Sequence, residues 1–207
     1  MKTKVHIFGI IALMMFTLSN FEAIAQKKGK KKGENVDWVK VRDLLAYNPE
    51  FMQEICCDCG PKTIEDILVG APAIDGIIKN ACKIAAKDIQ ITKDIEFIKI
   101  KMDTVDGFQT ADISDGKGKK ITAISAAKQL LKLTKVIGSL AAEAKSLADK
   151  KGPAQKEIEE ASFLKKASLG AGLARALDIL STVVSETGKQ GLKIKNQVDA
   201  LNMLKDF

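Results

Sequence analysis

The strongest constraint on the fold is a heptad pattern of apolar residues in the first half of the chain. Isoleucine on its own favours strands, but spacings of four and three that alternate over roughly thirty residues outweigh that preference. The pattern predicts a helix about 50 Å long, at a rise of 1.5 Å per residue. The members of this stripe are Ile77, Ala81, Ile84, Asp88, Ile91, Ile95, Ile98, Met102 and Val105.

Asp88 is the one polar member of this stripe, and it has two interpretations. It either pairs with a lysine inside the core and sets the register of the helices, as single polar core residues do, or it lies where the stripe drifts to the surface. The sequence leaves both open.

Two further helical patterns follow the first. The segment 106–120 is polar and contains glycine, which predicts a loop. After it comes a second stripe, made of Ala123, Ala126, Leu130, Leu133, Ile137, Leu140, Ala144 and Leu147. Lys151-Gly152-Pro153 then predicts a tight reversal of the chain.

The third long helix is predicted to run into Gly188 and Gly191, which we expect to kink or end it before a last helical segment. Gly170 and Gly172 lie among alanines and indicate a close approach between helices, whereas Arg175 in the same stretch disfavours a membrane-embedded dimer. The apolar stripe of this helix contains Leu169, Leu173, Ala176, Leu180 and Val183, and the last segment contains Ile194, Val198 and Leu201.

Shorter helical segments precede the long ones. We predict helices over residues 36–47, from Pro49 toward Ile55, and around Ile64 to Leu68. The expected fold class is therefore all-α: an antiparallel bundle of three long helices (72–207), with the short helices of 36–71 and a C-terminal segment packed against it. Residues 36–207 are expected to form one domain.

The first 25 residues are typical of a secretory signal peptide. Lys2 and Lys4 precede an apolar run from Val5 to Leu18, and Ala23-Ile24-Ala25 fits the small-x-small cleavage pattern. Lysines directly after such a run tend to stay in the cytoplasm, so an uncleaved membrane anchor is the alternative. We expect an exported protein, located in the periplasm or associated with the outer envelope.

Most of the net charge lies in a short arm, residues 26–35. Without residues 1–25 the chain keeps 31 of its 33 basic and 25 of its 26 acidic residues, and five of the remaining lysines lie in this Gly/Lys-rich segment. We expect the arm to be flexible. It is either a solvated tail or, together with a second lysine group in the long loop, a binding site for an anionic surface. The lysines concerned are Lys27, Lys28, Lys30, Lys31, Lys32, Lys117, Lys119 and Lys120.

Catalytic motifs are not recognisable in the sequence. His6, the only histidine, lies in the leader, so the mature chain lacks Ser-His-Asp and Cys-His arrangements and histidine-containing zinc sites. Phosphate-binding glycine loops and nucleophile elbows are absent from the sequence, and the loop aspartates do not match calcium-loop spacing. A glycosidase that uses two catalytic carboxylates stays open as an alternative, although the aromatic residues that stack on sugars in such enzymes are scarce here. We predict a protein that is not an enzyme and has no cofactor, metal or sequence-specific nucleic-acid partner.

The remaining candidates for chemistry are four cysteines: Cys56, Cys57, Cys59 and Cys82. An even number in an exported chain predicts disulfide bonding, with Cys56 or Cys57 joined to Cys82. Zinc binding and thiol exchange are alternatives, but C-C-x-C fits neither the usual zinc spacing nor C-x-x-C.

Three functional hypotheses follow. The first is an exported bacterial envelope protein that acts by binding or scaffolding through its helix faces, with a protein partner or with itself. The second is a peripheral binder of an anionic membrane or polysaccharide through the lysine arm. The third is a thiol-redox protein that uses the cysteine cluster.

Overall fold

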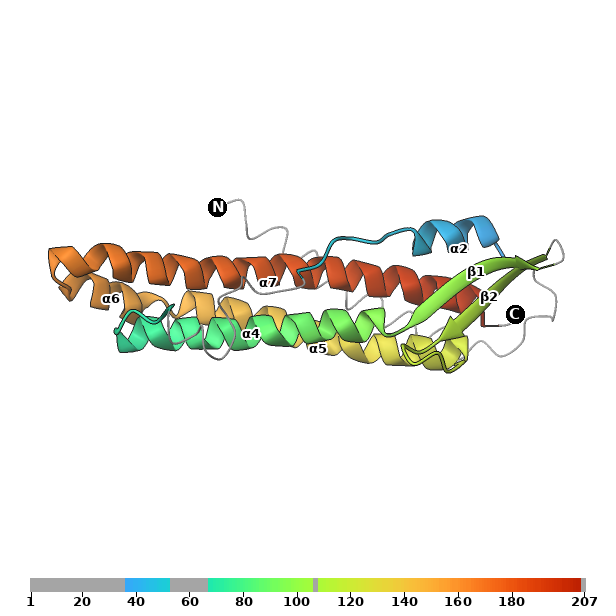
Figure 1. The fold of residues 1–207 in the computed structure, drawn as a ribbon, viewed down its shortest axis with the longest axis horizontal. Coiled ribbons are helices and arrows are strands. Elements are labelled where there is room, and N and C mark those ends of the chain that lie inside the picture. The colour runs from blue at the N-terminus through green and yellow to red at the C-terminus, as the bar shows by residue number, and fades with distance from the viewer. Residues whose placement is uncertain (1–35, 53–66, 106–107, 206–207) are drawn as a thin grey trace. The chain divides into compact units, whose positions relative to one another are not determined.

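The structure, a computed structural model, describes residues 36–52, 67–105 and 108–205. These residues are mostly helical, as the sequence predicts, with one small two-stranded sheet (Figure 1). The elements are α2 (Trp38–Leu45), α4 (Pro72–Glu96), β1 (Lys99–Val105), β2 (Phe108–Ser114), α5 (Ala123–Asp149), α6 (Gly152–Glu160) and α7 (Phe163–Met203).

The chain forms two compact units, and α4, α5 and α7 each contribute residues to both. Among the described residues, the first unit contains 36–49, 94–136 and 190–205. The second unit contains 50–52, 67–93 and 137–189.

In the second unit, the predicted stripes supply the buried side chains. Ile84, Leu140 and Leu180 are each at most 3% exposed. The Lys87 ammonium lies 3.0 Å from a Glu143 carboxylate oxygen and links α4 to α5. A Cβ atom added to Gly172 would lie 2.8 Å from Cγ1 of Val69, a residue that precedes α4, whereas one added to Gly170 would meet nothing within 4 Å. The close approach is therefore at Gly172 alone, and the nearest neighbour is a non-helical residue and not a second helix.

In the first unit, the sheet is an antiparallel hairpin whose register pairs Lys99 with Ser114 and Val105 with Phe108. A Cβ atom at Gly116 would lie 2.5 Å from the ring of Phe97, so the absence of a side chain there leaves room for the ring. Burial within this unit falls on residues from each of its helices, including Val41, Ile95, Leu130, Ile194 and Leu201.

The hairpin corrects two predictions, the extension of the first helix to Val105 and the loop over 106–120. The α4 helix ends at Glu96, and strands follow. Met102 and Val105 fit the heptad spacing by coincidence, because residues 99–102 also alternate lysine with an apolar residue, which is the period of a strand. The register leaves Asp106-Gly107 between the two strands, and this dipeptide is a strong sequence signal for a hairpin.

The prediction that the third long helix ends at Gly188 and Gly191 is also wrong, because α7 is continuous through both positions. The heptad spacing continues past Gly188, because Thr187 and Gln190, both at most 2% exposed, occupy the stripe between Val183 and Ile194. A glycine inside a helix costs about 1 kcal/mol relative to alanine, which packing of the flanking turns can offset.

Two smaller predictions change as well. The expected tight reversal at Lys151-Gly152-Pro153 is the beginning of α6, a helix of nine residues with proline in its first turn. Proline fits there because the first helical N–H groups need no partner within the helix. Pro49 to Met52 are not helical, so the predicted second short helix does not begin at Pro49.

Asp88 is fully buried in α4 of the second unit, with 0% of its surface exposed. The interpretation in which the stripe drifts to the surface at this position is therefore wrong. A buried carboxylate requires compensating polar contacts. The pairing with a lysine that would set the helix register stays a prediction.

Candidate functional site

The predicted cysteine site is described only in part. Cys82 lies on α4 and is 3% exposed. Cys56, Cys57 and Cys59 lie outside the described residues, so the disulfide remains a prediction.

The predicted anionic-surface site is also described in part. Lys117, Lys119 and Lys120 are exposed and follow β2 in the first unit. The backbone N–H groups of Lys117 and Lys119 both donate to Oδ1 of Asp115, at 2.9 Å, and the Lys120 ammonium lies 3.5 Å from Oδ1 of Asp112. The structural role of Asp115 is therefore to hold a turn. The arm lysines Lys27, Lys28, Lys30, Lys31 and Lys32 lie outside the described residues.

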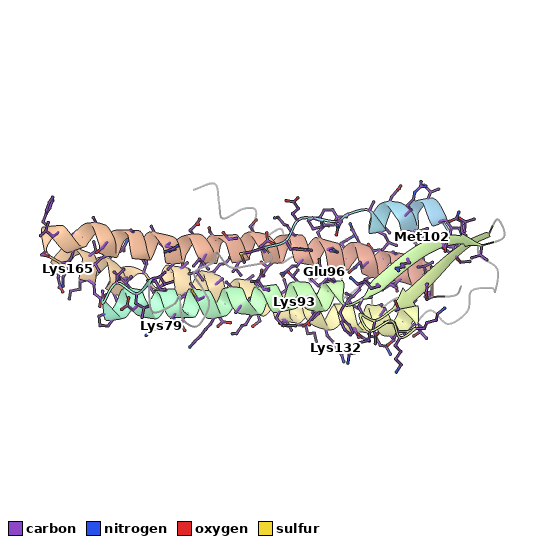
Figure 2. The ribbon with its side chains drawn as sticks, in the orientation of Figure 1. Lys79, Lys93, Glu96, Met102, Lys132 and Lys165 are labelled. Carbon is purple, nitrogen blue, oxygen red and sulfur yellow. The ribbon has the colours of Figure 1, made fainter. Side chains whose placement is uncertain are left out.

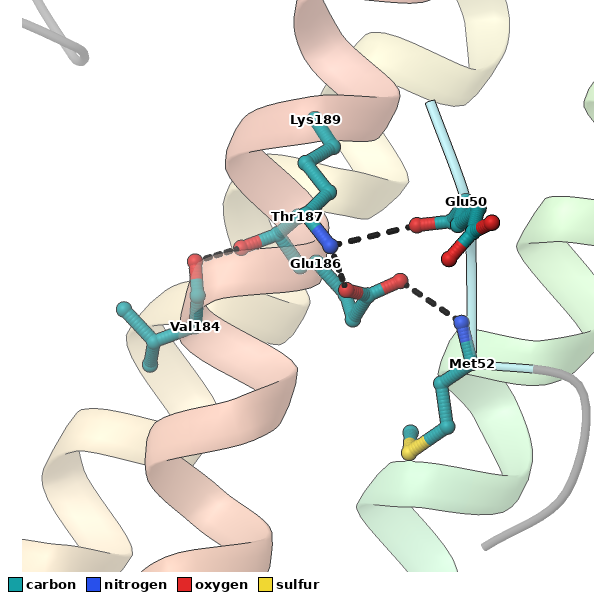
Figure 3. Close-up of polar contacts among 6 residues, drawn as sticks. All are labelled: Glu50, Met52, Val184, Glu186, Thr187 and Lys189. Atoms are coloured by element: carbon teal, nitrogen blue, oxygen red, sulfur yellow. Dashed lines mark hydrogen bonds and ion pairs between the residues drawn. The ribbon is translucent and has the colours of Figure 1, made fainter. Parts of the chain in front are cut away.

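An ion pair on α7, with one buried and one half-exposed partner, attaches the segment that leads toward the cysteine cluster (Figure 3). The Glu186 side chain is 5% exposed, and its Oε1 accepts from the Lys189 ammonium at 2.7 Å. Its Oε2 accepts from the backbone N–H of Met52 at 2.9 Å, and Lys189 also donates to the carbonyl oxygen of Glu50 at 3.1 Å. We call this group the α7 clamp. It holds residues 50–52 on α7.

The chain is attached to the same unit again at Val69. The backbone N–H of Val69 donates to Oδ1 of Asp75 at 2.8 Å, and its side chain lies against Gly172 of α7. Met52 and Val69 flank the segment that carries three of the four cysteines, so both flanks of that segment are held by carboxylates of the second unit.

A carboxylate from α6 covers the N-terminus of α4. The backbone N–H of Ala73 donates to both oxygens of Glu157, at 2.9 and 3.1 Å, and that of Ile74 donates to Oε2 at 3.2 Å. The first N–H groups of a helix lack partners within it and favour a negative charge. Glu157 is therefore a helix-capping residue and not a free acid for chemistry.

The first two turns of α7 are uncovered. Phe163 is 89% exposed and Leu164 is 87% exposed, and every residue from 163 to 168 is exposed. The first buried residue of α7 is Leu169, where the heptad stripe begins. Lys165 lies in this stretch (Figure 2). We call residues 163–168 the uncovered turns. None of the sequence predictions covers these turns, although the sequence carries a signal for them, since they precede the first member of the apolar stripe.

The α7 helix is long and apolar, and only part of it is buried. Within the described residues it is the one helix long and apolar enough to cross a membrane, by length and composition alone, and 33% of its most apolar window is buried. The core helix of a soluble protein passes the same test. At its beginning, two adjacent large apolar side chains, Phe163 and Leu164, are not part of the core.

Lys193 is a buried lysine in the α7 portion of the first unit. It is 9% exposed, and its ammonium donates to Oδ1 of Asn48 at 2.8 Å. Burial lowers the pKa of Lys193 from its ordinary value of 10.5, while the charge of Glu96 opposes this change and that of Lys99 adds to it.

This lowered pKa predicts a pH dependence of stability. Because the unfolded chain binds this proton more tightly than the folded protein, the free energy of unfolding rises with pH in the range just below 10.5. Lys193→Met removes this contribution, so the difference between wild type and variant is expected to grow in favour of wild type, by at most about 1.4 kcal/mol per pH unit. Urea unfolding of both proteins between pH 7 and pH 10 measures it, and a constant difference contradicts the prediction.

The described residues 36–52, 67–105 and 108–205 contain no group of three or more potential metal ligands. No protein-family model matches the chain, and the curated protein sequences and the solved structures likewise contain no match to it.

Proposed function

We propose that this chain is an exported bacterial cell-envelope protein that acts by binding. Within the residues that the structure describes, we propose that the uncovered turns of α7 form its binding surface. The observation that carries the proposal is the near-complete exposure of Phe163 and Leu164 side by side. Exposing two adjacent large apolar side chains costs free energy in water that contact with a partner recovers. Scattered single exposed residues elsewhere in the described chain carry no such argument.

We further infer that α4, α5 and α7 form the antiparallel three-helix bundle expected from the sequence. Contacts in the second unit support this: Lys87 of α4 meets Glu143 of α5, and Glu157 of α6, shortly after α5 ends, binds the first N–H groups of α4. A contact from α6, which follows α5, to the beginning of α4 is what an antiparallel arrangement of α4 and α5 would produce. Such a bundle is a rigid support for a binding surface at its end.

A photo-crosslinking residue at position 164, in cells that produce the chain, tests this proposal. We expect adducts at position 164 and none at Ser181, an exposed position of the same helix that serves as the control. Fractionation of the same cells checks export. Equal yields at both positions, or an entirely cytoplasmic chain, would overturn the proposal.

A further inference from the structure

We infer that the uncovered turns of α7 bind the surface of an anionic membrane. This inference rests on the proposed function and names the partner of the same surface. The surface involved is separate from the lysine arm, because it consists of residues 163–168 of α7.

The uncovered turns are amphipathic. At about 100° per residue, Phe163, Leu164 and Ala167 share one side of the helix, and Lys165 and Lys166 lie on the other. Ser162 directly precedes α7, and its carbonyl oxygen accepts from the N–H groups of Lys165 and Lys166, at 2.9 and 3.1 Å. The apolar side is therefore presented by ordered helix.

The residue types favour lipid over protein. Phenylalanine and leucine enter the boundary between headgroups and acyl chains, while neighbouring lysines extend to the phosphates. Lysine is depleted at protein interfaces, but each lysine near an anionic surface strengthens binding. Residues 163–168 contain two lysines and no acid.

The surrounding charges are compatible with this orientation. Lys150 and Lys151, between α5 and α6, are exposed. Of the acids of α6, Glu157 accepts from the first N–H groups of α4, and Glu160 lies 3.7 Å from the Lys156 ammonium. Three acids here, Asp149, Glu159 and Glu160, are exposed and oppose the attraction, and the exposed Lys150, Lys151 and Lys156 offset them. The lysines of the uncovered turns themselves are therefore the main electrostatic contribution.

Co-sedimentation of the full chain with vesicles tests the inference. We expect binding to vesicles rich in phosphatidylglycerol and weak binding to pure phosphatidylcholine. The double variant Phe163→Ser/Leu164→Ser is expected to reduce binding to the anionic vesicles by roughly tenfold or more, and Lys165→Gln/Lys166→Gln by a similar factor at low salt. The arm is present in every protein compared, so its contribution to binding is common to all.

The matched control replaces two exposed apolar residues of α5, Ile124 (53% exposed) and Val136 (49% exposed), by serine. This variant is expected to bind as wild type does. Circular dichroism confirms that each variant keeps its helices. If the control and the Phe163/Leu164 variant lose binding equally, or if neither does, the inference is wrong.

A direct readout comes from Phe163→Trp. Upon addition of anionic vesicles, the emission of this tryptophan is expected to shift to the blue and to be quenched by brominated lipid, relative to the wild-type signal from Trp38. Unchanged emission would overturn the inference. If position 164 crosslinks to a protein in cells while vesicles are not bound, the proposed function stands and the lipid assignment fails.

Discussion

Replacing Leu180 by alanine is expected to lower the free energy of unfolding by about 3 kcal/mol, within the usual range for a buried Leu→Ala change. Leu180 lies on the core side of α7 and is 1% exposed. The loss combines the transfer free energy of the deleted atoms with the cavity that they leave behind. Urea unfolding followed by circular dichroism measures it.

The matched control is Leu164→Ala, the same substitution in the same helix and the same unit. Leu164 is 87% exposed, so its removal is expected to change stability by less than about 0.5 kcal/mol. Similar losses at both positions would mean that the uncovered turns are packed in solution, which would contradict the binding surface proposed for α7.

Disrupting the α7 clamp is expected to have the second-largest effect. Glu186→Ala should cost about 2 kcal/mol, because it removes a buried carboxylate that accepts from Met52 and from Lys189. The Lys189 side chain is 41% exposed and can be rehydrated, which keeps the cost below that of a fully buried pair. A double-mutant cycle with Lys189→Met is expected to give a coupling free energy of about 1 kcal/mol.

Lys87 and Glu143 provide the control cycle. Their charged groups are also within hydrogen-bond distance, at 3.0 Å, but both side chains are about half exposed, at 57% and 49%. Solvent screens such a pair, so its coupling is expected to stay below about 0.5 kcal/mol. Equal coupling in the two cycles would show that burial of Glu186 does not strengthen its ion pair.

The helices were predictable because their signals are local. Every member of the first stripe from Ile77 to Ile98 is buried, and the second and third stripes coincide with α5 and α7. Heptad spacing identifies the apolar side of a helix regardless of which segment packs against that side. The helices can therefore be identified before their packing partners are known.

The hairpin was missed because two periods coincide at the end of the first stripe. Ile98, Met102 and Val105 satisfy the heptad, while Ile98, Ile100 and Met102 satisfy the alternation of a strand. The Asp106-Gly107 dipeptide separates these possibilities, since it is a poor helix interior and a good hairpin connection. The dipeptide therefore favours a helix that ends before Lys99.

The candidate site was predictable to a smaller extent. The lysines after β2 were identified from charge alone, and their exposure agrees with a surface role. Glu186, Glu157 and Asp75, by contrast, resemble any other acid on a polar helix face. Their partners are backbone N–H groups, which every residue except proline carries and which therefore leave no mark in the sequence.

The sequence by itself determined that this chain is mainly helical and where the apolar side of each long helix lies, because helix periodicity is a relation between residues three and four positions apart. Only the tertiary structure decided which polar residues are buried and which apolar ones are not. Glu186 binds the backbone of Met52, 134 residues away, whereas Phe163 and Leu164 stay exposed because packing along α7 begins only at Leu169. Burial depends on what a side chain meets across the fold, and that is fixed by contacts between segments distant in the chain.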